Sequence, residues 1–186
     1  YVGKGFYDSE IVTTVTPGER NQVSVYFNIE EGLISKISEI NIIGNKAFSE
    51  KDLRKEMQLS TGGWFSWYSK NDRYSKQKLT ADLESIRSFY LNQGYLEFRI
   101  DSTQISISPD KKGMYITINI FEGEQYRVKD IKLGGEMFGK EEELKALVPL
   151  KSGEIFSSAK LNVGTKAIAD ALSAYGYAFA TITPQP

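Results

Sequence analysis

An internal repeat constrains the fold of this 186-residue chain more than any other feature. At an offset of 91 residues, the segment ending at Gly32 aligns with the segment ending at Gly123, and Ile40 aligns with Ile131. Past the aromatic stretch "WFSWYSKND" (64–72), which the second copy lacks, the offset becomes 82. A fixed period of this size indicates repeated structural units. We therefore expect the end of one unit (1–31), a complete unit (32–122), and a unit without its final strands (123–186).

The complete unit predicts five elements in the order β-α-α-β-β. A strand is expected over 36–44, which is rich in isoleucine and ends at Gly44-Asn45. Ser49 is a natural N-cap for a short helix, with Asp52 three residues later. Apolar residues spaced by four and three predict a second helix over 75–93. Strands follow over 96–107 and 114–120, joined by a turn at 108–113.

Three stretches of the chain share a glycine followed by an aromatic residue at the expected end of a helix. Gly94-Tyr95 and Gly176-Tyr177 follow helical patterns, and "YVGKGFY" at the start of the chain has the same outline. Glycine adopts the positive φ that a Schellman ending requires, and the next residue then contacts the last helical turn. We expect Tyr95 on Tyr90, Tyr177 on Leu172, and Phe6 on Tyr1.

These elements predict an α+β fold of tandem repeats. Each unit would have a three-stranded mixed sheet that two antiparallel helices cover on one face, because such a two-layer arrangement buries a single core.

The composition excludes several classes of function. The chain has no cysteine and no histidine, so the most common metal ligands and the most common acid–base group are missing. The net charge of −1 does not suggest binding to nucleic acid. We recognise no catalytic spacing and no phosphate-binding glycine loop, and we expect no enzyme activity, no cofactor and no small-molecule ligand. Residue 1 is tyrosine, so we expect a piece of a longer chain.

The segments "INIIGNKAFSEKDL", "RSFYLNQGYLEF" and "VYFNIEEG" with its counterpart "ITINIFEG" carry a resemblance to a known family. Together with the β-α-α-β-β order, they resemble POTRA domains, the polypeptide-transport-associated modules. The run from "QKLTADL" to "EGEQYRV" is similar to the third such domain of outer-membrane protein assembly factors. Residues 1–31 would then end the second domain, and 123–186 would be most of the fourth.

The resemblance implies a periplasmic scaffold in the assembly of outer-membrane β-barrel proteins. It implies lipoproteins of the assembly complex, periplasmic chaperones and unfolded outer-membrane proteins as partners. Contact with the membrane would come only through a β-barrel elsewhere in the full-length protein. The alternative is the POTRA region of a two-partner secretion protein or of another POTRA-bearing transporter; such proteins carry one or two units.

The strand over 96–107 is the first candidate for partner binding. The family topology makes it an edge strand, which offers main-chain groups to an extended peptide. Its apolar residues change parity between Ile100 and Ile105, which suggests a β-bulge between Asp101 and Gln104. In the alternative interpretation Ile105 and Ile107 are core residues after the bulge. The candidate contact residues are Ile100, Asp101, Gln104, Ile105, Ser106 and Ile107.

Two further sets of residues are candidates for function. Trp64, Phe65 and Trp67 would be either an interface anchor or a lid over the unit's own helices, because a large exposed aromatic surface favours aggregation. The joints between units are expected at Glu31-Gly32 and Gly123-Glu124.

Overall fold

The computed structural model describes residues 9–18, 22–30, 36–61, 74–110, 112–137, 139–177 and 180–185. The chain divides into two compact units. Unit 1 comprises residues 1–86 and 100–120, and unit 2 comprises residues 87–99 and 121–186. Within the described ranges, none of the helices is both long and apolar enough to cross a bilayer.

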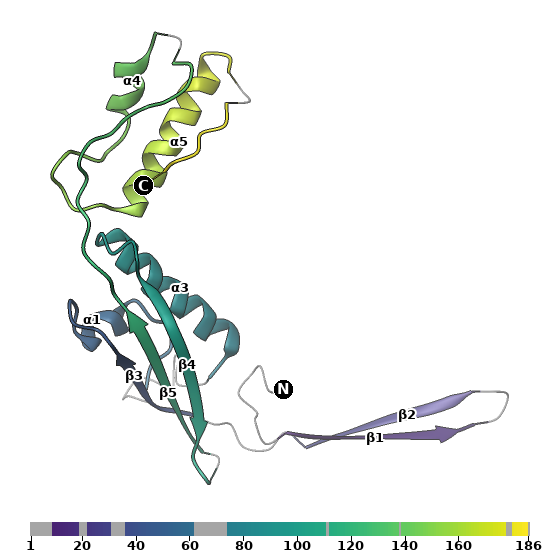
Figure 1. The fold of residues 1–186 in the computed structure, drawn as a ribbon. Helices are drawn as coiled ribbons and strands as arrows, with labels where there is room; N and C mark the ends of the chain where they lie inside the picture. Colours follow the sequence, from purple (N-terminus) through teal and green to yellow (C-terminus); the bar gives the residue numbers. More distant parts are fainter. Residues whose placement is uncertain are drawn as a thin grey trace. The chain divides into compact units, whose positions relative to one another are not determined.

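A three-stranded mixed sheet is the centre of unit 1 (Figure 1). Its order is β3 (Lys36–Ile43), β5 (Gly113–Phe121), β4 (Arg99–Ile107), with β3 parallel to β5. The last strand therefore lies in the middle, as the resemblance implied. The strand predicted to begin at residue 96 begins instead at Arg99. Residues 95–98 form a turn, in which the Phe98 amide donates to the Tyr95 carbonyl at 3.2 Å.

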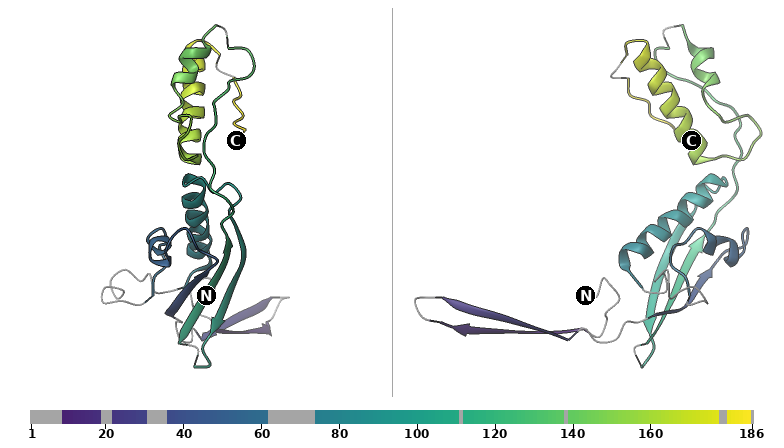
Figure 2. Two further views of the ribbon diagram at one scale, coloured as in Figure 1. Left: turned by 60° about the vertical axis from the view of Figure 1, so that its left-hand side comes forward. Right: turned by 180° about the vertical axis from the view of Figure 1, so that it is seen from behind.

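Helices α1 (Glu50–Lys55) and α3 (Lys76–Asn92) lie on one face of this sheet (Figure 2). The Ser49 hydroxyl caps α1 by accepting from the Asp52 amide, which confirms the predicted N-cap. Alternate residues of β5 are buried, which is the pattern of a strand with one face on a core. In unit 1 the most deeply buried apolar residues, each at most 1% exposed, are Ile37, Ile40, Leu53, Ile86, Met114, Ile116 and Ile118.

Two of the three predicted glycine endings lie in the described residues, at the ends of α3 and α5, and both have Schellman geometry. Gly94 has φ 87°, and the Tyr95 amide donates to the Tyr90 carbonyl at 3.0 Å. Gly176 has φ 93°, and the Tyr177 amide donates to the Leu172 carbonyl at 2.9 Å. The rings of Tyr90 and Tyr95 meet edge to face with centroids 5.5 Å apart. The third predicted ending, with Phe6 on Tyr1, lies outside the described residues.

Unit 2 contains helices α4 (Glu141–Ala146) and α5 (Ser158–Ala174). Its core cluster consists of Leu144, Ile168 and Leu172. At the repeat offset of 91, residues 127–134 are equivalent to β3, but among the described residues their only strand pairing is an isolated bridge between Arg127 and Ile155. The described residues of this unit include no strand that occupies the place of β5, and a strand forms only beside a partner.

The N-terminal part of the described chain is a hairpin. Strands β1 (Glu10–Pro17) and β2 (Val23–Glu30) pair antiparallel in a two-stranded sheet. Every residue of both strands is exposed. Val23, Val25, Phe27 and Ile29 alternate with other residues along β2, which is the sequence pattern of a strand with one apolar face, although none of these residues is buried.

Candidate peptide-binding edge

Strand β4 lies at an edge of its sheet. Among the described residues it pairs only with β5, because the strand order is β3-β5-β4. The turn that joins it to β5 is closed by the Ser108 amide, which donates to the Gly113 carbonyl at 2.8 Å. The amides of an antiparallel strand point alternately to its two sides. Since the Ser108 amide points to β5, those of Ile105 and Ile107 point to the open edge.

The second half of β4 is exposed on both faces. Gln104, Ile105, Ser106 and Ile107 are consecutive exposed residues. The two isoleucines are 41% and 39% exposed, so neither belongs to the buried core. The segment that exposes its main chain therefore also exposes two apolar side chains. An extended peptide that pairs with this edge would cover both.

The first half of β4 is held more firmly. Ile100 is half-buried, and the Ser102 hydroxyl accepts from the Asn119 side-chain amide of β5 at 2.8 Å. Ser102 and Thr103 are both half-buried, so the alternation of burial is lost between Asp101 and Gln104. This is the predicted position of the bulge, which itself stays a prediction.

The opposite edge of the sheet differs from β4. The Arg54 guanidinium of α1 donates to the Ile40 carbonyl of β3 and to the Glu50 carboxylate. The register with β5 shifts between Ile37 and Glu39, which places an extra residue in β3. A side chain on a main-chain carbonyl and a bulge are two devices that protect an edge strand. Neither feature could be predicted from the sequence, since neither follows from residue spacing.

Three of the predicted site residues, Trp64, Phe65 and Trp67, lie outside the described residues, as do Glu31 and Gly32. Their roles as interface aromatics and as a joint stay predictions. Among the candidate residues that the structure describes, only those of β4 therefore lie together on one strand.

The second predicted joint lies in unit 2 among several polar contacts. Gly123 has φ 73°, and a Cβ there would lie 2.7 Å from the Cβ of Glu97. Just before it, the buried Glu122 carboxylate accepts from the Tyr90 hydroxyl at 2.7 Å. Burial, and then this hydrogen bond, raise the pKa of Tyr90 above its ordinary value. The role of Gly123 and Glu124 as a joint stays a prediction.

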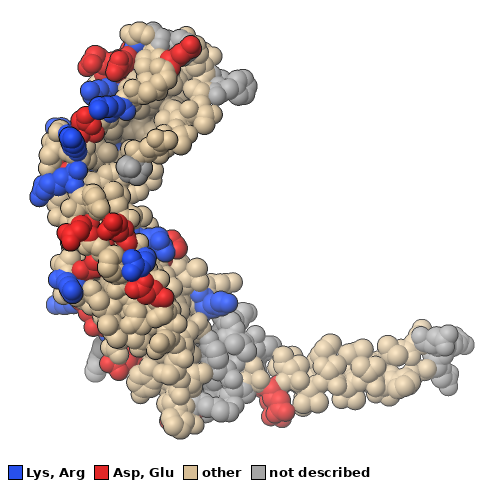
Figure 3. Space-filling view, viewed as in Figure 1, with Lys and Arg blue, Asp and Glu red and all other residues tan. Residues whose placement is uncertain are grey.

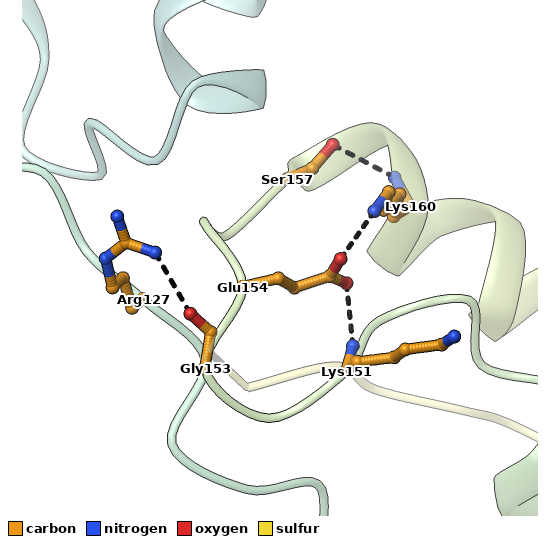
Figure 4. A network of polar contacts seen from close by, with 6 residues as sticks. All are labelled: Arg127, Lys151, Gly153, Glu154, Ser157 and Lys160. Carbon is orange, nitrogen blue, oxygen red and sulfur yellow. Dashed lines mark hydrogen bonds and ion pairs between the residues drawn. The ribbon is translucent and has the colours of Figure 1, made fainter.

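The start of α5 is tied to the segment at residue 127 by the network in Figure 4. Arg127 donates to the Gly153 carbonyl at 3.0 Å. The Glu154 carboxylate accepts from the Lys151 amide at 2.6 Å and from the Lys160 ammonium at 2.8 Å. These contacts lower the pKa of Glu154, with the Lys160 hydrogen bond as the largest cause. The network holds one side of residues 127–129 in place.

Comparison with known proteins gives a consistent result. The family model POTRA, described as a surface antigen variable number repeat, matches residues 35–123 and 126–186. The outer membrane protein assembly factor BamA of Neisseria meningitidis serogroup B is 31% identical over 187 residues, covering 100% of this chain and 24% of that protein. BamA of Buchnera aphidicola is 30% identical over 169 residues, covering 90% of this chain and 27% of that protein. The chain thus spans about a quarter of the length of these relatives.

A solved structure supports the fold. The crystal structure of Haemophilus influenzae BamA POTRA3-5 matches with a TM-score of 0.67 and 26% identity, covering 80% of this chain and 58% of that one. The mixed sheet, the helices on its face and the family match over both repeats agree with one another. The chain therefore belongs to the POTRA family.

Proposed function

We propose that this chain is a periplasmic scaffold in the assembly of outer-membrane β-barrel proteins. Its relatives are named as outer membrane protein assembly factors, and this supports assembly over two-partner secretion. In this proposal the open edge of β4 binds extended segments of partner lipoproteins, of chaperones and of unfolded outer-membrane proteins by β-augmentation. The observation that carries the proposal is the exposed edge at Gln104–Ile107.

Main-chain pairing suits a scaffold that receives many clients. Each hydrogen bond to the Ile105 or Ile107 main chain is independent of the client's side chains, so the site tolerates different sequences. Ile105 and Ile107 would add a preference for clients with apolar residues at alternate positions, as in strands that face a core or a membrane. This chemistry requires no catalytic group. Within the described ranges no group of three or more Asp and Glu residues is arranged to hold a metal ion.

The test separates main-chain pairing from side-chain contact at one position. In Ile105→Pro the outward amide is lost while the amides that point to β5 remain, and in Ile105→Ala the amide is kept and the side chain is shortened. The probe is a synthetic peptide of alternating valine and threonine with lysine at each end, titrated against the protein by calorimetry. We expect Ile105→Pro to weaken binding roughly tenfold or more and Ile105→Ala to weaken it only about two- to threefold. Equal effects of the two variants, or no binding by the parent chain, would overturn the proposal.

A further inference from the structure

In the part of the chain that the structure describes, the second half of β4 lacks the devices that protect β3. The edge at β3 has the Arg54 guanidinium on a main-chain carbonyl and an extra residue in the strand. From Gln104 to Ser108 the sequence contains no charged residue and no proline, which are common means of protecting an edge strand. In Figure 3 the lower end of the sheet, where β4 meets its turn, shows mostly uncharged surface. This stretch is therefore open to a strand of its own kind as well as to a client.

The hydrogen-bonding pattern of this stretch is complementary to itself. Because the Ser108 amide bonds to β5, the main-chain groups of Ser106 also point to β5, and those of Ile105 and Ile107 point to the open edge. When two copies meet antiparallel about a two-fold axis at Ser106, Ile105 of each copy lies opposite Ile107 of the other. Opposite residues of this kind exchange both of their main-chain hydrogen bonds. The pairing stops after Ser108, because Pro109 has no amide hydrogen.

The same axis brings the exposed isoleucines together. Ile105 and Ile107 are two positions apart, so their side chains share one face of the strand. They are 41% and 39% exposed in the single chain. In the paired arrangement, each isoleucine lies opposite an isoleucine of the other copy, at the distance where apolar cross-strand pairs stabilise a sheet. The one residue of this stretch that faces its own counterpart is Ser106, which is neutral, so no like charges are opposed.

Helix α3 leaves room for such a partner. Figures 1 and 2 show β4 and β5 running past the start of α3, at Lys76, toward the turn that joins the two strands. The stretch from Gln104 to Ser108 leads into that turn, so it lies beyond the start of the helix. An antiparallel arrangement about Ser106 places the α3 helices of the two copies toward opposite ends of the paired strands.

We propose that two copies of this chain associate through β4, antiparallel about a two-fold axis at Ser106, and join their three-stranded sheets into one. The contact uses the same surface on both copies, so it closes at the dimer. The pairing is short and buries far less than the roughly 1,000 Å² of a stable interface, so the dimer is weak. It covers the outward amides of Ile105 and Ile107. Two copies therefore mask each other's edge until a client competes, a regulatory role that rests on the function proposed above.

A single engineered cysteine tests the position of the axis, because the chain has none of its own. Gln104 and Ser106 are both exposed and share a face of β4, so they make a matched pair of positions. Two Ser106→Cys side chains meet at the axis with their Cα atoms about 4.5 Å apart, which permits a disulfide. Two Gln104→Cys side chains are roughly 13 Å apart along the strands, which does not. Under mild oxidation we expect roughly tenfold more linked dimer from Ser106→Cys than from Gln104→Cys.

The linked dimer then tests whether pairing masks the client site. The reduced Ser106→Cys chain keeps both outward amides, so it should bind the valine–threonine peptide within about twofold of the parent. The disulfide-linked dimer should bind the peptide roughly tenfold or more weakly, and reduction should restore binding. Without any crosslink, sedimentation equilibrium of the parent chain should show an average mass that rises between about 10 µM and about 1 mM. Ile105→Pro, which loses an outward amide, should associate roughly tenfold more weakly.

The outcomes separate this inference from the function proposed above. Equal crosslinking of the two cysteine variants, or a parent chain that stays monomeric up to about 1 mM, would overturn the dimer. A linked Ser106→Cys dimer that binds peptide as well as the reduced chain would overturn the masking. A parent chain that binds no peptide would overturn the proposed function and with it the masking, while a selective Ser106→Cys crosslink would still support the dimer. Selective crosslinking together with peptide binding that returns on reduction would confirm both.

Discussion

Asp82 and Gly164 occupy the same position in the long helices of the two repeats and solve one packing problem in two ways. The buried Asp82 carboxylate accepts from the main-chain amides of Gln58 and Leu59 at 2.7 and 2.9 Å. In the second repeat the equivalent of Gln58 is Pro149, which has no amide hydrogen to offer. A carboxylate at position 164 would therefore lack one of the two amide donors that Asp82 has. Gly164, which has no side chain, instead lets α5 approach the main chain at Val148.

Removing the Asp82 carboxylate should therefore destabilise unit 1 strongly. Asp82→Ala leaves the amides of Gln58 and of the buried Leu59 without their acceptor, and we expect it to lower the free energy of unfolding by about 2–4 kcal/mol. Glu39→Ala, on the exposed face of β3, is the control and should change it by less than about 0.5 kcal/mol. Urea denaturation followed by circular dichroism measures both. Similar stabilities of the two variants would show that the Asp82 bonds matter little.

The Tyr90–Glu122 contact makes a prediction at alkaline pH. The pKa of Tyr90 is raised in the folded chain, whereas in the unfolded chain it lies near 10. Above that pH the unfolded chain releases a proton that the folded chain keeps, so the free energy of unfolding falls. The Tyr90→Phe variant has no hydroxyl at this position, so it cannot show this loss of unfolding free energy. Denaturation at about pH 8 and about pH 10.5 should reveal a stability difference between parent and variant that shrinks as pH rises. A difference that stays constant, or that widens, contradicts the assignment.

Two glycines of unit 2 should respond differently to alanine. Gly123 has a positive φ and its added Cβ would lie 2.7 Å from that of Glu97, whereas Gly134 has open space around it. We expect Gly123→Ala to cost about 1–3 kcal/mol of stability and Gly134→Ala to be close to neutral. Thermal unfolding of both variants beside the parent provides the measurement. Equal melting temperatures for the two variants would mean that the backbone at Gly123 relaxes freely.

The network around Glu154 predicts a change in acid stability. The pKa of this carboxyl is lowered by the hydrogen bonds from Lys160 and from the Lys151 amide. Its contribution to stability is therefore present above the unfolded pKa near 4.5 and is lost as pH falls through the lowered value. Glu154→Gln should make stability fall less steeply between about pH 5 and about pH 3. Unchanged steepness in the variant would show that the network is too exposed to contribute.

The repeat, the helix endings and the element order could be predicted from sequence, because each depends on local chemistry. Gly94 and Tyr95 specify a helix ending within a few residues, and Met114 to Ile120 alternate in a way that only a one-sided strand does. The start of β4 at Arg99 was missed because the turn at 95–98 forms after the Schellman ending, where no proline or second glycine marks it.

The candidate site was harder to predict. The family topology predicted that β4 is an edge strand. The exposure of Ile105 and Ile107 could not be predicted, since their apolar character equally suited a buried strand. The guanidinium of Arg54 on the Ile40 carbonyl joins residues 14 positions apart through tertiary packing alone. The strand β1 could have been found, because Ile11, Thr13 and Val15 alternate opposite the recognised pattern of β2.

Pairing of a foreign extended chain with the open edge of β4, as proposed above, can be measured by hydrogen exchange at single amides. Uniformly labelled protein would be studied with and without the valine–threonine peptide. We expect the amides of Ile105 and Ile107 to become protected when peptide is bound, while that of Ser108, already bonded to Gly113, keeps its protection. Binding that leaves the exchange of Ile105 and Ile107 unchanged would contradict the proposed pairing at this edge.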